Sequence, residues 1–190
     1  FHTRSFKRYA LRMLLFAVLS EVPFDLMYGG TVFYPVHQNV IWTLLLGLLG
    51  IRLMEAARAK GKRWLYVLTC AAVVVLGFAL GTLGMVDYYG AGVLTVFAFY
   101  FFRERKWWCL LGQLAALYWL NVAVLGGQMY PVTVFGREIE LCEQGLALLA
   151  LVPIWLYRGR QGHHSKAFQY ACYAFYPAHM LVLALLTMIQ

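Results

Sequence analysis

The stretch WLYVLTCAAVVVLGFALGTLGMV, residues 64–86, runs for 23 residues without a charged side chain. At a rise of about 1.5 Å per residue, a helix of this length covers a hydrocarbon layer of roughly 30 Å. Lys60, Lys62 and Arg63 come just before the stretch, and Asp87 follows it. Charge is therefore confined to the two ends of the run, which predicts a helix that spans a membrane.

Six other apolar runs are separated by short charged clusters. Only 13% of all residues are charged and 63% are hydrophobic, whereas roughly 25% are charged in soluble domains. The strands of a membrane barrel would alternate apolar and polar residues, which these runs do not. We therefore predict an all-α polytopic membrane protein, with residues 1–190 forming a single bundle of about seven transmembrane helices. The other runs cover residues 9–20, 40–57, 88–102, 107–125, 141–157 and 168–189.

Basic residues gather in alternate connections between the runs. Fifteen of the 16 Lys and Arg residues lie in these connections, whereas the remaining connections hold six acidic residues and only Arg137 as a basic one. Because cytoplasmic loops accumulate Lys and Arg, this pattern predicts a cytoplasmic N-terminus and a C-terminus at the outer face. The net charge of +8 then follows from topology, so nucleic acid is not expected as a partner. The basic residues on the predicted cytoplasmic side are Arg4, Lys7, Arg8, Arg12, Arg52, Arg58, Lys60, Lys62, Arg63, Arg103, Arg105, Lys106, Arg158, Arg160 and Lys166.

The first two runs are short for a membrane crossing. Tyr9–Leu19 offers 11 residues and Val40–Ile51 offers 12, whereas about 20 are needed. The block SEVPFD, residues 20–25, follows the first run, and the block HQN, residues 37–39, precedes the second. Pro23 is expected to break the first helix and to free backbone carbonyls for a ligand.

These two blocks predict a polar cavity that opens outward from within the membrane. Ionisable side chains at such depth are costly, which favours a functional role. The alternative is a solvated outer loop, in which Asn39 caps the second helix and the acids are ordinary surface charges. The residues assigned to the cavity are Glu21, Asp25, His37, Gln38 and Asn39.

Other positions also bear on the chemistry. His179 lies 11 residues into the last run, beside Pro177, and a neutral imidazole there either exchanges a proton or hydrogen-bonds to a neighbouring helix. Asp87, in the turn after the third run, either faces the same cavity or caps the next helix. The pair at residues 163–164 has no further ligands at metal spacing, so no metal site is expected.

Five blocks resemble the TraX family: FHTRSFKRYALRMLLFAVLSEVPFDL (1–26), HQNVIWTLLLGLL (37–49), DYYGAGVL (87–94), LVPIWLY (151–157) and FYPAHM (175–180). This family is named for the conjugative pilin acetylase and is related to acyltransferase-3-like membrane enzymes. The resemblance implies a multi-pass protein of the bacterial inner membrane. It further implies acetyl transfer from acetyl-CoA, on the cytoplasmic side, to an acceptor at the outer face. That acceptor is the pilin N-terminal amine in the named member, and a surface glycan hydroxyl is the other class considered.

Acyl transfer requires a base that removes the acceptor proton and donors that stabilise an oxyanion. Our hypothesis makes His37 or His179 the base, with Asp25 or Glu21 orienting the imidazole. The residues expected to bind the acceptor or the oxyanion are Asn39, Gln38, Asp87 and Tyr88.

Members of the family begin with further spans and an Asp–His pair near the first helix, so the sequence is expected to be an N-terminally truncated fragment. Two other classes of function stay open. A proton-coupled transporter or flippase would also use intramembrane carboxylates and histidines, and would act without acetyl-CoA. A non-enzymatic scaffold subunit would bind a partner helix at its polar ends and would tolerate replacement of these residues.

Overall fold

The computed structural model describes residues 5–134, 136–157, 159 and 165–189, and its described part is mostly helical. The two longest α-helices lie at the ends of the chain, and a strand pair interrupts the helices in its second half. The α-helices are α1 (Phe6–Gly29), α2 (Val40–Ala59), α3 (Arg63–Leu83), α4 (Tyr89–Phe101), α5 (Trp107–Tyr118), α6 (Leu151–Leu156) and α7 (Lys166–Ile189). The other elements are the π-helix η1 (Trp119–Leu125), strands β1 (Met129–Val134) and β2 (Arg137–Cys142), and the 3₁₀ helix η2 (Glu143–Ala150).

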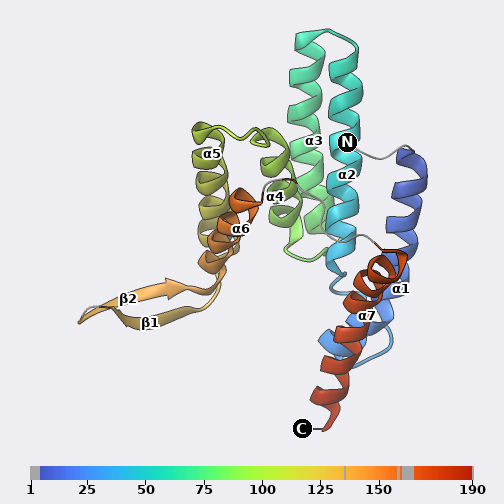
Figure 1. Ribbon diagram of the computed structural model, residues 1–190, viewed down its shortest axis with the longest axis vertical. Helices are drawn as coiled ribbons and strands as arrows, with labels where there is room; N and C mark the ends of the chain where they lie inside the picture. Colours follow the sequence, from blue (N-terminus) through green and yellow to red (C-terminus); the bar gives the residue numbers. More distant parts are fainter. Residues whose placement is uncertain (1–4, 135, 158, 160–164, 190) are drawn as a thin grey trace.

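Helices α2, α3 and α4 form the centre of the structure. Helix α1 packs on α2, and α7 packs on α1 (Figure 1). On the other side of this centre, α5 packs on α4, and η2 packs on α5. Figure 1 also shows the turn between α2 and α3 at one end of the molecule, with the strand pair and the C-terminus toward the other end. The basic turn around Lys60 and Lys62 is thus well separated from the acidic strand pair.

The apolar core joins α2, α3 and α4. Its centre is Phe97 of α4, which is 2% exposed and packs with Met54 of α2 and Val73 of α3. Gly81 lets α3 approach α4, because a Cβ atom there would lie 2.9 Å from the carbonyl oxygen of Tyr89. This rigid core positions the turn between α3 and α4.

Four helices are long and apolar enough to cross a membrane: Val40–Ala59, Arg63–Leu83, Trp107–Leu125 and Lys166–Met188. Three of the seven predicted spans are therefore not supported in the part of the chain that the structure describes. Helix α4 has 13 residues, or roughly 20 Å, and the segment before residue 157 is divided between η2 and α6. Helix α1 is long enough, but five charged residues lie along it: Lys7, Arg8, Arg12, Glu21 and Asp25.

The first two helices are longer than the sequence indicated. Helix α1 continues through Pro23 and ends at Gly29, so the prediction that Pro23 breaks the helix is wrong. Pro23 is buried, and packing around a helix lets it tolerate the lost backbone hydrogen bond. Helix α2 has 20 residues, because Arg52 stays within it and places its guanidinium over the Phe6 ring, 5.5 Å from the centroid.

The antiparallel pair β1–β2 departs from the all-α prediction. Its register pairs Tyr130 with Leu141 and Val132 with Ile139. The β-branched residues around these positions favour extended backbone, and Gly136, with φ +75°, provides the turn. The apolar–polar alternation in β2 covers only residues 138–141, within a segment predicted as a loop followed by a span. Arg4, Arg158 and Arg160 of the predicted cytoplasmic clusters lie outside the described residues.

Candidate functional site

Two loops meet beside the start of α2. The loop from α1 to α2 leaves Gly30, which has φ +66° and ends α1. The backbone N–H of Gln38 donates to the carbonyl of Met85, 2.8 Å away, and Gln38 and Val86 form an isolated parallel bridge. This pairing joins the HQN block to the turn between α3 and α4, although about 50 residues separate them.

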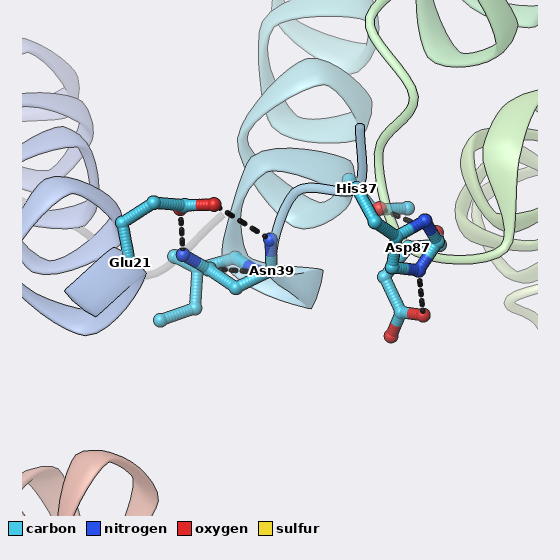
Figure 2. Close-up of polar contacts among 6 residues, drawn as sticks. Glu21, His37, Asn39 and Asp87 are labelled. Carbon is cyan, nitrogen blue, oxygen red and sulfur yellow. Dashed lines mark hydrogen bonds and ion pairs between the residues drawn. The ribbon is translucent and has the colours of Figure 1, made fainter. Parts of the chain in front are cut away.

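The result is a contact between His37 and Asp87. Nε2 of His37 lies 3.4 Å from Oδ1 of Asp87, and Figure 2 shows the ring edge facing the carboxylate. His37 is only 8% exposed. Asp87 had been expected either to face the predicted cavity or to cap α4. Its side chain faces His37, and the N-cap residue Tyr88 makes no side-chain cap bond.

Aromatic rings enclose the His37 imidazole. Tyr28 stacks on it at 4.7 Å between centroids, Phe24 lies at 5.7 Å, and Tyr89 meets it edge-on at 5.6 Å. Such rings exclude water and lower the local dielectric, which strengthens the electrostatic effect of the adjacent carboxylate. The arrangement suits proton transfer at the imidazole.

Burial raises the pKa of the Asp87 carboxyl, although the neighbouring His37 acts in the opposite direction. The hydroxyl of Thr43 on α2 donates to the backbone carbonyl of Asp87, 2.7 Å away. This bond anchors the turn to α2. Asp87 is therefore held at a fixed position while its carboxylate remains able to exchange a proton.

The turn that carries Asp87 is strained. Met85, Tyr88 and Tyr89 have φ values of 50°, 59° and 50°. Left-handed backbone costs roughly 1–2 kcal/mol for a residue with a Cβ atom. Strain of this kind persists only where surrounding contacts impose it, and it concentrates at functional sites.

A second polar cluster joins α1 to α2. Glu21 accepts from Nε1 of Trp42 at 2.8 Å and from the side-chain amide of Asn39. Asn39 also caps α2, because its Oδ1 accepts from the backbone N–H of Ile41 at 3.0 Å. Its amide donates to the Ala17 carbonyl as well, at 2.9 Å. Both amide protons of Asn39 are thus committed within the protein.

The predicted site residues are only partly brought together. Asp87 is the carboxylate that contacts His37, whereas Glu21 binds Asn39 and Trp42, and Asp25 accepts from the backbone N–H of Tyr34 at 3.0 Å. The carboxylate in contact with His37 is therefore Asp87, and the hydrogen bonds described for Glu21 and Asp25 go to other residues. Figure 2 shows two separate pairs, Glu21 with Asn39 and His37 with Asp87. Gln38 donates to the Pro35 carbonyl, 3.1 Å away.

His179 lies in a different environment on α7. Its Nδ1 is 2.9 Å from the carbonyl of Phe175. Because a carbonyl only accepts, this places the proton on Nδ1 and leaves Nε2 as an acceptor. The ring stacks on Phe175 and meets Tyr176 edge-on. His163 and His164, considered above as metal ligands, lie outside the described residues.

A cavity of about 470 Å³ lies between α1 and α7. Arg12 lines it near the beginning of α1, and Phe16 and Tyr173 line it further along the two helices. Neither this cavity nor the hydrogen bond from Trp42 to Glu21 was predicted from the sequence. Asn39 and Trp42 are three residues apart at the start of a helix, so their side chains lie on one face. This spacing could have indicated that both bind the same partner, which is Glu21.

Comparison with known proteins places the chain in a family. No curated protein and no solved structure matches it significantly. The family model described as TraX protein matches residues 1–187, nearly the entire sequence. The chain therefore belongs to the TraX protein family.

Proposed function

We propose that the protein is a membrane acetyltransferase, which moves an acetyl group from acetyl-CoA to an amine or hydroxyl presented at the outer face. Membership of the TraX family supports this reaction class. The observation that carries the proposal is the contact between the buried His37 and the partly exposed Asp87, because it provides a base and a carboxylate to orient it.

His37 takes the proton from the acceptor as the acceptor attacks the acyl carbon. Asp87 fixes the orientation of the imidazole and stabilises its charged form as the proton arrives. The stacked rings of Phe24 and Tyr28 hold the imidazole plane. Glu21 and Asn39 maintain the junction of α1 and α2 on which the HQN loop rests.

The cavity between α1 and α7 fits the donor arm. Its lining is largely apolar and aromatic, with Arg12 and Gln169 as its polar members near the start of the two helices. Lys7 and Arg8 lie one turn before Arg12 and would attract the phosphates of acetyl-CoA. When bound, acetyl-CoA would supply an acyl thioester, whose thiolate is the leaving group. In this arrangement the basic end of the molecule faces the cytoplasm.

The proposal is tested with the intact protein purified in detergent. Release of CoA thiol from acetyl-CoA is measured with a synthetic peptide that has a free N-terminal amine, and separately with a glycan that has free hydroxyls. The same measurement is repeated with His37→Gln. Acceptor-dependent thiol release that is lost in the variant supports the proposal. The absence of thiol release with both acceptors contradicts it and favours the transporter.

A further inference from the structure

Three side-chain oxygens on α1 and α7 are buried without a hydrogen-bond partner. They are Oγ of Ser20, Oδ1 of Asp25 and Oη of Tyr176. Ser20 is completely buried and Asp25 is 2% exposed. Because more than nine in ten buried polar groups in proteins are hydrogen-bonded, these three oxygens are exceptions that require an explanation, and a catalytic role is one such explanation.

Tyr176 lies where α7 meets the beginning of α2. Its ring packs on Phe16 of α1, with 6.1 Å between centroids. The backbone of Val40 lies beside its hydroxyl, and the charges of Glu21 and Asp87 both act on it. The hydroxyl is therefore close to the start of α2, and it donates to no acceptor among the described residues.

This hydroxyl belongs to a residue of α7 that lies one helical turn beyond the residues lining the cavity between α1 and α7. Phe16, Leu19 and Tyr173 line that cavity. Tyr176 is three residues after Tyr173, and Ser20 is four after Phe16, so each lies on the same helix face as a lining residue, one helical turn further along. Pro23 and Pro177 lie inside the two helices at this level. Neither proline has an N–H, so the carbonyls one turn before them lack their usual helical donor.

The other candidate donors near His37 are already committed or exposed. Both amide protons of Asn39 bind acceptors within the protein, the Ala17 carbonyl and the Glu21 carboxylate. The side chain of Tyr88 is 45% exposed. A donor in apolar surroundings stabilises a developing negative charge better than one in water. Tyr176 is the donor whose hydroxyl oxygen is buried away from water and makes no hydrogen bond to another described residue.

We propose that the Tyr176 hydroxyl is a catalytic group that binds the acyl carbonyl oxygen and donates a hydrogen bond to the oxyanion. The proposal rests on the acetyltransferase function above. The acceptor nitrogen or oxygen forms a bond to the carbonyl carbon, and its proton passes to His37. The carbon–sulfur bond then breaks, its electron pair leaves on sulfur, and His37 returns the proton to the thiolate. Tyr176 keeps its own proton, and Ser20 provides a second donor.

The test is Tyr176→Phe in the intact protein, assayed for CoA release with the free-amine peptide and for thermal unfolding. Loss of one oxyanion donor is expected to lower kcat by about 10²–10³-fold, with KM for the peptide unchanged. The melting temperature is expected to stay the same or rise, because the change removes a buried hydroxyl that has no partner. The opposite signs of the two effects distinguish a catalytic from a structural hydroxyl.

Tyr118→Phe is the matched control, because Tyr118 is an exposed residue of α5 on the other side of the bundle. Its kcat and melting temperature are expected to equal those of the wild type. If Tyr176→Phe keeps the wild-type kcat, or loses activity only in proportion to stability, the role of Tyr176 is overturned while the acetyltransferase function stands. Wild-type protein that releases no CoA overturns both.

Discussion

The two carboxylates beside the start of α2 have opposite surroundings. Glu21 accepts hydrogen bonds from the indole of Trp42 and the amide of Asn39, and these donors belong to α2 or its cap. Asp87 has one side-chain partner, His37, at 3.4 Å. The carboxylate of Glu21 is saturated by donors that cannot give up their protons, whereas that of Asp87 faces an imidazole, whose ring nitrogens can both donate and accept a proton.

This difference assigns the two carboxylates different roles: we expect Glu21 to stabilise the structure and Asp87 to take part in the chemistry. A saturated carboxylate holds two helices together, and its protonation or removal leaves buried donors unpaired. A carboxylate paired with an imidazole can follow the charge on that ring during a proton transfer. The four predictions below test this division, beginning with the largest effect.

Replacing His37 should have the largest effect on catalysis. His37→Gln is expected to lower kcat by about 10²–10⁴-fold, the usual contribution of a general base. His179→Gln should cost less than about 10-fold, because its Nδ1 only bonds to a carbonyl of its own helix. CoA release by the two variants, measured in parallel, decides between the histidines. Wild-type rates in both variants would eliminate both as the base.

Removing the saturated carboxylate should chiefly reduce stability. Glu21→Ala leaves the buried amide of Asn39 and the indole of Trp42 without their acceptor, and each loss costs about 1–3 kcal/mol. We expect the free energy of unfolding to fall by about 2–4 kcal/mol, as measured by denaturation in detergent. Glu138→Ala, on the exposed strand β2, is the control and should be neutral. An unchanged melting temperature for Glu21→Ala would show that the hydrogen bonds of Glu21 do not stabilise the packing of α1 on α2.

Asp87→Asn should reduce activity about 10–10²-fold, because the amide no longer stabilises the imidazolium. The pH dependence of stability gives a second measurement. Folding raises the pKa of this carboxyl above its usual 3.8. Its stabilising contribution is therefore present below the usual pKa and is lost as the pH rises through the raised value.

The wild type should consequently gain stability relative to Asp87→Asn as the pH falls from neutral toward 4. Melting temperatures of both proteins across this range provide the test. In a His37→Gln background the trend should be larger, because His37 lowers the pKa of Asp87. A wild type that loses stability relative to Asp87→Asn on acidification would contradict the assigned effect of burial.

The smallest effect should come from one donor of the saturated cluster. Trp42→Phe removes the indole N–H that binds Glu21 but keeps most of the ring volume. Because the Asn39 amide still binds the carboxylate, the expected loss is about 1–2 kcal/mol in the free energy of unfolding. Activity per folded molecule should not change. A large fall in kcat without a loss of stability would place Glu21 in the chemistry instead.

The sequence predicted the helical membrane character, because uncharged runs such as residues 64–86 have few other structures open to them. It did not predict the ends of the helices. Pro23 and Arg52 both interrupt an apolar pattern, yet α1 and α2 continue through them. Pro23 is buried in the folded protein, and the guanidinium of Arg52 lies over the ring of Phe6. These are tertiary contacts that no local pattern contains.

The candidate site shows the same limit. The polar composition of the SEVPFD and HQN blocks indicated a shared location, and Asn39 does cap α2 as one interpretation held. The pairing of His37 with Asp87 depends on the backbone bond between Gln38 and Met85. A contact across such a sequence separation is set by how the α2–α3–α4 core packs, and side-chain chemistry alone does not specify it. The function of these residues stays a prediction.

The left-handed backbone at Met85 is also an opportunity for protein engineering. A glycine at this position adopts φ near +50° without steric cost, whereas methionine does not. Met85 is exposed, and its carbonyl, which binds Gln38, would be retained. Met85→Gly should therefore gain a few tenths to about 1 kcal/mol. A variant with a higher free energy of unfolding would be useful for crystallisation, and the residues around His37 would be unchanged.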